Sequence, residues 1–535
     1  MDQDDNQESQ RRIRSTRAAR SISAAVLLSR ILGLVRDRFF ARLFGAGAYM
    51  DAYIVAFRIP NLFRDLVAEG ALSSAFVPTF TEILRKQGKE EAWRLANLVI
   101  SALLLLLGLL AVAFFALSDY WVYLLAAGFA GDPGKLEVTS NLVRILSPFL
   151  IFVSVASVLI GMLNALNRFF VPALAPALFN LVLIFFCIFV VPWFEYEGIL
   201  AVYAVALGAL VGGALQCAVQ FPLLYRRGYR FRLGLDFRHP ALRRIGRLVA
   251  PALLGVSALQ INILINTQLA SWLGGDGPVS WLNFAFRIMY LPIGLCGVAV
   301  GVVNLREVSV SAAREEWDGL KAMVAHSVKT VSLIALPAGV GLLILAGPIV
   351  RLLFETGEFD ADATGNTANA LICYSFGLVA YSCIKVYAPT FYALGDTRTP
   401  VRSSLIAVAT NLAVNLFLIW LLPPAHKYLG LAVGTAASVW VNLVLLVRAF
   451  GRRVGSSASH RVASTVAKNL VASILMGVVV GFLGIYLQLE VARSTWLENA
   501  AALFGCIGAG AVFYFACCRL LGVEEVGHLF ARLRK

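Results

Sequence analysis

The feature that most constrains this chain is a succession of apolar runs, each at least as long as the roughly 20 residues that a bilayer span requires. Such runs are too long for sheet strands and lack the alternation of an outer-membrane barrel. Hydrophobic residues fill 59% of the 535 positions and charged residues 14%, whereas soluble domains carry about 25% charged residues. This composition excludes a soluble globular protein and a disordered chain. The sequence therefore predicts an all-α polytopic membrane protein.

The apolar runs predict about 14 transmembrane helices. Each run is bounded by charged residues or by clusters of glycine and proline. The predicted spans are 21–44, 51–81, 95–118, 141–164, 171–192, 199–224, 248–273, 278–304, 326–348, 367–393, 401–422, 429–449, 465–488 and 497–520.

Basic residues are distributed unevenly between the connecting loops. With the N-terminus in the cytoplasm, the loops on that side hold most of the lysines and arginines, including the Arg-rich segment 226–247. The opposite loops hold mainly Lys135, Arg351, Lys427 and Arg493. Lysine and arginine collect in cytoplasmic loops and set topology. We therefore expect both termini to be cytoplasmic, and the net charge of +15 requires no nucleic-acid partner.

Short motifs recur at a nearly constant separation. Ala56–Ile59 (AFRI) recurs as Ala285–Ile288, and Ala165-Leu166 recurs as Ala393-Leu394. Six predicted spans separate the members of each pair, so the two halves share one orientation. Parallel repeats of this kind are typical of transporters, with the substrate site between the halves.

The repeat and the spans together predict the domain organisation. A cytoplasmic tail is followed by an N-lobe of spans 1–6, a basic cytoplasmic segment, a C-lobe of spans 7–12, two additional helices and a second tail. The corresponding boundaries are 1–20, 21–224, 225–247, 248–449, 450–520 and 521–535.

Four arginines within the predicted spans are the strongest functional signal: Arg30, Arg36, Arg64 and Arg287. A charged residue at the bilayer centre costs about 2.5–3.5 kcal/mol on the insertion scale, so it persists where it meets a partner, water or a ligand. The nearby carboxylates are too few to neutralise all four, which indicates an anionic ligand. The planar arginine fork favours phosphate, and we expect a phosphorylated substrate.

Other intramembrane charges have simpler interpretations. Asp37 and Asp65 are expected to neutralise neighbouring arginines, and Arg58 can pair with Glu69. Lys385 is able to extend its ammonium to the cytoplasmic surface.

Two asparagine pairs lie in predicted spans 7 and 11. Asn262 and Asn266 are four residues apart, as are Asn411 and Asn415, so each pair shares one helix face. The side-chain oxygens of these asparagines can bind a coupling cation. Alternatively, the side-chain amides can form hydrogen bonds that bridge helices. Bridging between helices is the favoured interpretation.

A set of motifs spread in order over most of the chain resembles the lipid II flippase family (MurJ, also called MviN). This family belongs to the superfamily of multidrug, oligosaccharidyl-lipid and polysaccharide exporters. The matching segments are Ser29–Asp37, Phe44–Gly47, Asp51–Tyr53, Phe57–Arg64, Ala68–Ala71, Leu163–Ala165, Arg168-Phe169, Gln260–Asn262, Arg351–Phe354, Lys385–Pro389, Phe391–Ala393 and Gly395–Pro400.

The resemblance implies the helical fold of that superfamily, with the last two helices forming a lipid-facing groove. It implies cavity residues at Arg30, Arg36, Asp51, Arg64 and Arg287. The substrate-binding set that we predict also includes Ser29, Arg58, Glu69 and Lys385. The chain departs from some relatives beside Arg287, where Phe286 and Tyr290 replace acidic residues.

The implied function is transport of lipid II, the undecaprenyl-diphosphate-disaccharide-pentapeptide, from the inner to the outer leaflet by alternating access. We expect a monomer in the bacterial inner membrane, surrounded by membrane lipids, with no enzymatic activity, no bound metal and no cofactor. A coupling cation such as sodium and the membrane potential are the expected energy sources. The alternative is a cation-coupled exporter of drugs or of another polyprenyl-linked glycan. An enzyme acting on polyprenyl phosphates would need a metal-binding carboxylate cluster or an acid–base pair, which the sequence does not present.

Overall fold

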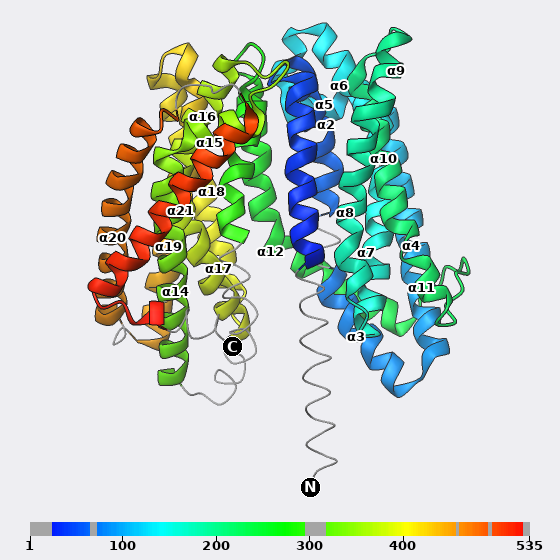
Figure 1. Ribbon diagram of the computed structural model, residues 1–535. Coiled ribbons are helices and arrows are strands. Elements are labelled where there is room, and N and C mark those ends of the chain that lie inside the picture. Colours follow the sequence, from blue (N-terminus) through cyan, green and yellow to red (C-terminus); the bar gives the residue numbers. More distant parts are fainter. Residues whose placement is uncertain (1–23, 65–71, 295–316, 456–458, 490–494, 528–535) are drawn as a thin grey trace, which may run out of the picture. The chain divides into compact units, whose positions relative to one another are not determined.

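A computed structural model of the chain describes residues 24–64, 72–294, 317–455, 459–489 and 495–527. These residues form helices joined by short turns (Figure 1). Residues 24–44 and 278–294 form two of the helices. The labelled elements are α2 (Ala48–Phe63), α3 (Leu72–Lys86), α4 (Lys89–Ala116), α5 (Ser118–Ala126), η2 (Ala127–Gly131), α6 (Pro133–Leu146), α7 (Phe149–Ala165), α8 (Phe170–Phe185), η3 (Phe186–Val190), α9 (Val191–Tyr196), α10 (Ala201–Ala218), α11 (Phe221–Tyr225), α12 (Pro240–Ser271), α14 (Trp317–Ile344), α15 (Ala346–Phe354), α16 (Ala361–Ser375), α17 (Leu378–Ala393), α18 (Arg398–Leu421), η4 (Pro424–His426), α19 (Lys427–Val454), α20 (Ser459–Tyr486) and α21 (Trp496–Leu520).

The described residues contain nine segments that are long and apolar enough to cross a membrane. A tenth results if α16 and α17, which are bent by 46° at the break between them, form one span. The chain is therefore an all-helical polytopic membrane protein, as its composition predicts.

Two predicted spans are interrupted within the described residues, and a third contains a segment outside them. The predicted span 51–81 contains α2 and α3, with residues 65–71 between them lying outside the described residues. The predicted span 326–348 covers parts of α14 and α15, and 367–393 covers parts of α16 and α17. The composition remains apolar at Leu345 and at Phe376-Gly377, so hydropathy does not reveal the breaks in 326–348 and 367–393.

Two predicted spans begin earlier than expected. The helix α6 begins at Pro133 rather than near position 141, because the Asp132 carboxylate caps it by accepting a hydrogen bond from the Lys135 backbone N–H at 3.1 Å. The helix α12 begins at Pro240, inside the segment predicted as a basic loop. Capping residues and a proline in the first turn set a helix start, whereas hydropathy marks only its apolar part.

The chain divides into two compact units. Unit 1 comprises Met1–Gln260 and Thr356–Glu358, and unit 2 comprises Ile261–Glu355 and Phe359–Lys535. Within unit 1, α10 packs against α7 and α8, and α2 packs along α6 (Figure 1). The contact with α6 holds α2, the helix that carries Asp51 and Arg58.

The basic segment after α11 is held against α4. Tyr229 is buried in the core of unit 1. The Asn97 side-chain amide donates to the Arg230 carbonyl at 3.1 Å, and the Gly234 N–H donates to the Ser101 hydroxyl at 3.2 Å. Unit 1 itself therefore fixes the backbone of this segment.

Two glycines allow a distant turn to join unit 1. The Glu358 backbone N–H donates to the Arg42 carbonyl at 3.1 Å. Gly45, with φ of 58°, ends helix 24–44, and Gly357, with φ of 57°, forms the turn. A Cβ atom at Gly45 would overlap the Glu358 backbone, and one at Gly357 would overlap the Arg42 backbone. Glycine is required at both positions for the backbone conformation and for the close approach.

In unit 2, α18 packs most extensively along α19, and α14 packs against α20. The helix α20 also contacts α21, and these helices share an apolar core that includes Met476, Val480 and Leu503. The close packing of α18 and α19 depends on a glycine, because a Cβ atom at Gly430 would lie 2.8 Å from the Leu418 side chain.

Candidate functional site

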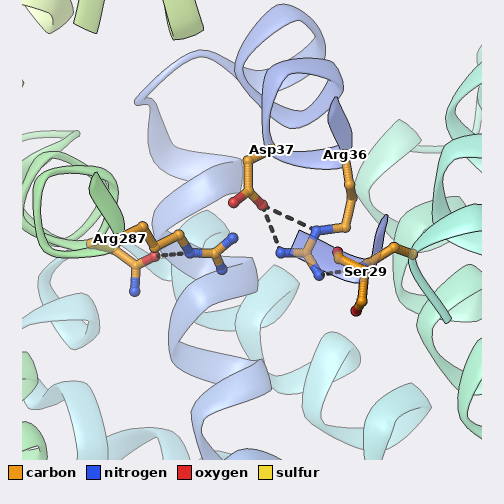
Figure 2. A network of polar contacts seen from close by, with 6 residues as sticks. Ser29, Arg36, Asp37 and Arg287 are labelled. Carbon is orange, nitrogen blue, oxygen red and sulfur yellow. Dashed lines mark hydrogen bonds and ion pairs between the residues drawn. The ribbon is translucent and has the colours of Figure 1, made fainter. Parts of the chain in front are cut away.

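Arg36 is the centre of a polar cluster in unit 1 (Figure 2). Its Nε and Nη2 atoms donate to Asp37 Oδ1 at 3.0 and 2.7 Å, and its Nη1 atom donates to Asn180 Oδ1 of α8 at 2.9 Å. The Asn180 amide nitrogen in turn donates to the Ser29 carbonyl at 3.0 Å. The Arg36 and Asp37 side chains are only 15% and 6% exposed. The cluster thus fixes a cation inside the unit.

The Arg36–Asp37 ion pair confirms that Asp37 neutralises a neighbouring arginine. A guanidinium has five N–H donors, and the contacts with Asp37 and Asn180 use three of them. The carboxylate and the amide therefore orient the guanidinium, and these contacts leave two of its N–H groups unused. Sequence reasoning missed Asn180, because no spacing rule connects it with residues about 150 positions earlier.

Asp51 takes part in a second buried ion pair of unit 1. Its Oδ2 atom accepts a hydrogen bond from Lys135 Nζ at 2.9 Å, and the two side chains are 1% and 4% exposed. The lysine ammonium also lies 4.4 Å from the centre of the Phe129 ring. The pair joins α2 to α6. Lys135, predicted as a loop residue that reports topology, is thus the buried partner of a predicted site residue.

The other predicted site residues of unit 1 lie on the same helices. Arg30 is partly buried on helix 24–44, and Arg58 is partly buried on α2. Arg64 is the C-cap of α2, where its backbone N–H bonds to the carbonyls of the preceding turn. Asp65 and Glu69 lie outside the described residues, as does the expected pairing of Arg58 with Glu69.

In unit 2, Arg287 and Lys385 each contact a polar group of helix 278–294. The Arg287 Nε atom donates to Asn283 Oδ1 at 3.0 Å, one helical turn away (Figure 2). The Lys385 Nζ atom of α17 donates to the Tyr290 hydroxyl at 3.3 Å and lies 4.7 Å from the centre of its ring. Asn283 therefore helps to orient Arg287, and Tyr290 helps to orient Lys385.

An aromatic cluster accompanies Arg287. The ring centre of Phe286 lies 5.6 Å from that of Tyr374 and 6.2 Å from that of Tyr381, and Tyr290 lies 6.4 Å from Tyr381. Tyr374 and Tyr381 were not predicted to belong to the site. Their spacing of seven positions was a weak signal, because residues seven apart on one helix share a face. However, the break between α16 and α17 lies between Tyr374 and Tyr381.

The asparagine pairs meet in the interior of unit 2, where they connect three helices. Asn266 of α12 donates to the Thr435 hydroxyl of α19 at 2.9 Å and to Asn262 Oδ1 at 3.3 Å. On α18, Asn411 donates to the same Thr435 hydroxyl at 3.4 Å, and Asn415 donates to Asn266 Oδ1 at 2.8 Å. These contacts support the interpretation that the asparagines bridge helices.

The orientation of the Asn415 amide does not affect this conclusion. Rotated by 180° about its last bond, the Asn415 amide donates instead to the carbonyls of Gly430 at 3.3 Å and Asn411 at 3.2 Å. Its oxygen then faces the Asn266 side-chain amide. Asn415 bridges between helices in either orientation.

We expect Asn411→Leu to destabilise the protein by about 1–3 kcal/mol, because it removes one hydrogen bond from the Thr435 hydroxyl and one from the Asn415 amide. Thermal unfolding of the purified protein in detergent measures the effect. Thr410→Val is the matched control, since the Thr410 hydroxyl donates to the Ile406 carbonyl of its own helix. Equal melting temperatures for the two variants would show that the network does not stabilise the junction.

Comparison with known proteins identifies the family. A family model described as lipid II flippase MurJ matches residues 40–500. The chain belongs to the lipid II flippase MurJ family. A MurJ protein of Burkholderia cenocepacia is 33% identical over 513 residues, covering 95% of this chain and 98% of that protein. A probable MurJ of Rhizobium meliloti is 35% identical over 506 residues, covering 93% of this chain and 92% of the relative.

Solved structures with a similar fold include a MurJ protein and MATE transporters. A structure of a lipid II flippase MurJ in an inward closed conformation matches with a TM-score of 0.76 at 24% identity, covering 94% of this chain and 99% of that one. An inward-facing multidrug transporter of the MATE family matches with a TM-score of 0.65 at 16% identity, covering 82% and 99%. The fold is therefore shared by MurJ and MATE proteins. MurJ is a family of transporters, so the prediction that the chain is not an enzyme is confirmed.

Proposed function

We propose that this chain is a flippase that moves lipid II from the inner to the outer leaflet of the bacterial cytoplasmic membrane by alternating access. The observation that carries the proposal is the similarity to MurJ proteins over nearly the whole chain, at 33% identity with the Burkholderia relative. The arginines inside the apolar helices supply a chemical reason, since a diphosphate headgroup needs cationic partners.

In the proposed cycle, the diphosphate of lipid II contacts Arg36 and Arg287 while the polyprenyl tail remains in the bilayer. Asp37 and Asn180 hold the Arg36 guanidinium, and Asn283 holds that of Arg287. The proposed substrate-binding set also contains Arg30, Arg58, Arg64, Ser29, Glu69, Asp51 and Lys385. Asp51 acts through its ion pair with Lys135. An inside-negative potential favours outward movement of an anionic headgroup by about 2.3 kcal/mol per charge per 100 mV.

The proposed architecture has 14 spans, as the apolar runs predict, with two lobes at 21–224 and 248–449. A basic segment at 225–247 joins the lobes, and the helices of 450–520 form the lipid groove. The tails at 1–20 and 521–535 lie in the cytoplasm. The repeat and the distribution of basic residues support this organisation. We propose a monomer as the working unit.

The second candidate is a cation-coupled exporter of drugs or of another polyprenyl-linked glycan. The fold shared with MATE transporters supports it. The intramembrane arginines count against an organic-cation substrate, because like charges repel in a medium of low dielectric constant.

Depletion of the chain in its own cells tests the proposal. We expect the amount of lipid II accessible at the outer face to fall and lipid II to accumulate inside, and re-expression of the chain should reverse both changes. Unchanged outer-face lipid II after verified loss of the chain would reject the flippase function and favour the exporter.

A further inference from the structure

A cavity of about 540 Å³ lies beside α17, α18 and α19 in unit 2. Its lining is strongly basic, with arginines from the N-terminal part of α18 and the last turns of α19. The four arginines are Arg402, Arg448, Arg452 and Arg453. The volume is in the range of small-molecule sites in proteins, about 300–1,000 Å³.

Helix geometry brings three of these arginines to one place. Arg448 and Arg452 are four residues apart on α19 and therefore share a face. Arg402 lies on α18, the helix that packs most extensively along α19. All three side chains are exposed, and none has an ion-pair partner within the described part of the chain.

The fourth arginine forms the rim of the cavity. Arg453 Nη1 donates to Asp396 Oδ2 at 2.9 Å. Asp396 also accepts hydrogen bonds from the Thr399 N–H at 3.0 Å and the Thr399 hydroxyl at 2.7 Å. Burial alone would raise the pKa of the Asp396 carboxyl, but these hydrogen bonds and the Arg453 charge lower that pKa overall. Asp396 therefore stays ionised, and the lining residues carry a net charge of three positive units.

Apart from Thr399 and Ser403, the remaining wall of the cavity is apolar. Phe391, Ile406, Leu445 and Ala449 line it. Ile406 is one turn further along α18 than Arg402 and is itself exposed. A cationic end next to an exposed apolar surface suits an amphiphile whose anionic head meets the arginines and whose chains follow the helices.

We propose that this cavity binds the phosphodiester headgroup of an anionic phospholipid. Arg402, Arg448 and Arg452 donate to the phosphate oxygens, and the apolar wall contacts the first part of the acyl chains. Basic pockets between transmembrane helices recognise anionic lipid headgroups in this way. A zwitterionic choline lipid carries the same phosphate, but the excess positive charge of the lining repels its ammonium group.

The positive-inside rule offers a different explanation for the same arginines, because it requires only that they lie in the cytoplasm. The two explanations make different predictions. A purely topological arginine is interchangeable with any other exposed arginine of the cytoplasmic loops, whereas a lining arginine is not. The exposed arginines Arg226, Arg227 and Arg232 of the basic segment after α11 provide the matched set.

Native mass spectrometry of the full chain in detergent tests the proposal. The probes are a phosphatidylglycerol, a phosphatidylcholine with identical acyl chains, and inorganic phosphate. We expect the triple variant R402Q/R448Q/R452Q to bind phosphatidylglycerol at least about tenfold more weakly than the unmodified chain, since one charge-assisted hydrogen bond contributes about 1.5–3 kcal/mol. The triple variant R226Q/R227Q/R232Q removes the same charge and should bind almost normally.

If the two triple variants lose phosphatidylglycerol affinity equally, the proposal is overturned, and general electrostatic attraction explains the binding. Inorganic phosphate that displaces the lipid at equal concentration would overturn the lipid assignment and indicate a site for soluble anions. Equal binding of the choline lipid would also contradict the proposal. The melting temperature without lipid checks folding, and R402K/R448K/R452K keeps the charge if the glutamine variant does not fold. The lysine variant should retain part of the affinity, because lysine lacks the bidentate fork.

Discussion

Arg287→Ala is expected to yield a folded protein that does not support growth of cells depleted of the native chain. The variant removes a cation that Asn283 orients from one turn away. Each charge-assisted hydrogen bond to a diphosphate contributes about 1.5–3 kcal/mol, so its loss weakens substrate binding about tenfold to a hundredfold. Arg64→Ala, at the end of α2, is expected to have the same phenotype.

Complementation of growth at matched protein levels measures this effect, and the melting temperature confirms that each variant folds. Arg232→Ala is the control, because Arg232 is an exposed residue of the basic segment and is not part of the proposed binding set. Normal growth with Arg287→Ala would remove Arg287 from that set and would undercut the proposed anion pocket.

Lys135→Met is expected to destabilise the protein by about 3–5 kcal/mol, the range measured when one partner of a buried ion pair is removed. The reason is the burial of Asp51, whose carboxylate lies 2.9 Å from Lys135 Nζ and is 1% exposed. Thermal unfolding in detergent, together with the yield of folded protein, measures the loss.

The double variant Asp51→Asn with Lys135→Met separates stability from transport. Replacing both charges of a buried pair is often neutral for stability, so the double variant should unfold close to the native temperature. If it also supports growth, Asp51 is a structural residue and leaves the proposed substrate-binding set. A single Lys135→Met variant as stable as the native chain would show that the ion pair does not stabilise unit 1.

The sequence predicted the class of fold because burial in lipid imposes long apolar runs, and these are visible without any knowledge of packing. A charge inside such a run is conspicuous, which is why Arg36 and Arg287 are predicted as site residues. The breaks in the predicted spans 326–348 and 367–393 were missed, since the composition remains apolar through them.

The partners of the charges were harder to predict than the charges themselves. The pairing of Asp51 with Lys135 joins residues 84 positions apart, and the contact of Arg36 with Asn180 joins residues 144 positions apart. Such contacts depend on which helices pack together, and hydropathy does not determine that choice. Asp37 was predicted correctly because it is adjacent to Arg36 in the chain.

The amide network of α12, α18 and α19 has a consequence for proton coupling. Asparagine and threonine side chains do not titrate in the physiological range. The hydrogen bonds of Asn266 and Asn411 with Thr435, and that of Asn415 with Asn266, therefore persist unchanged on both sides of a pH gradient. This junction holds its three helices together regardless of local acidity, so any movement of unit 2 that is driven by protons has to be triggered at other side chains.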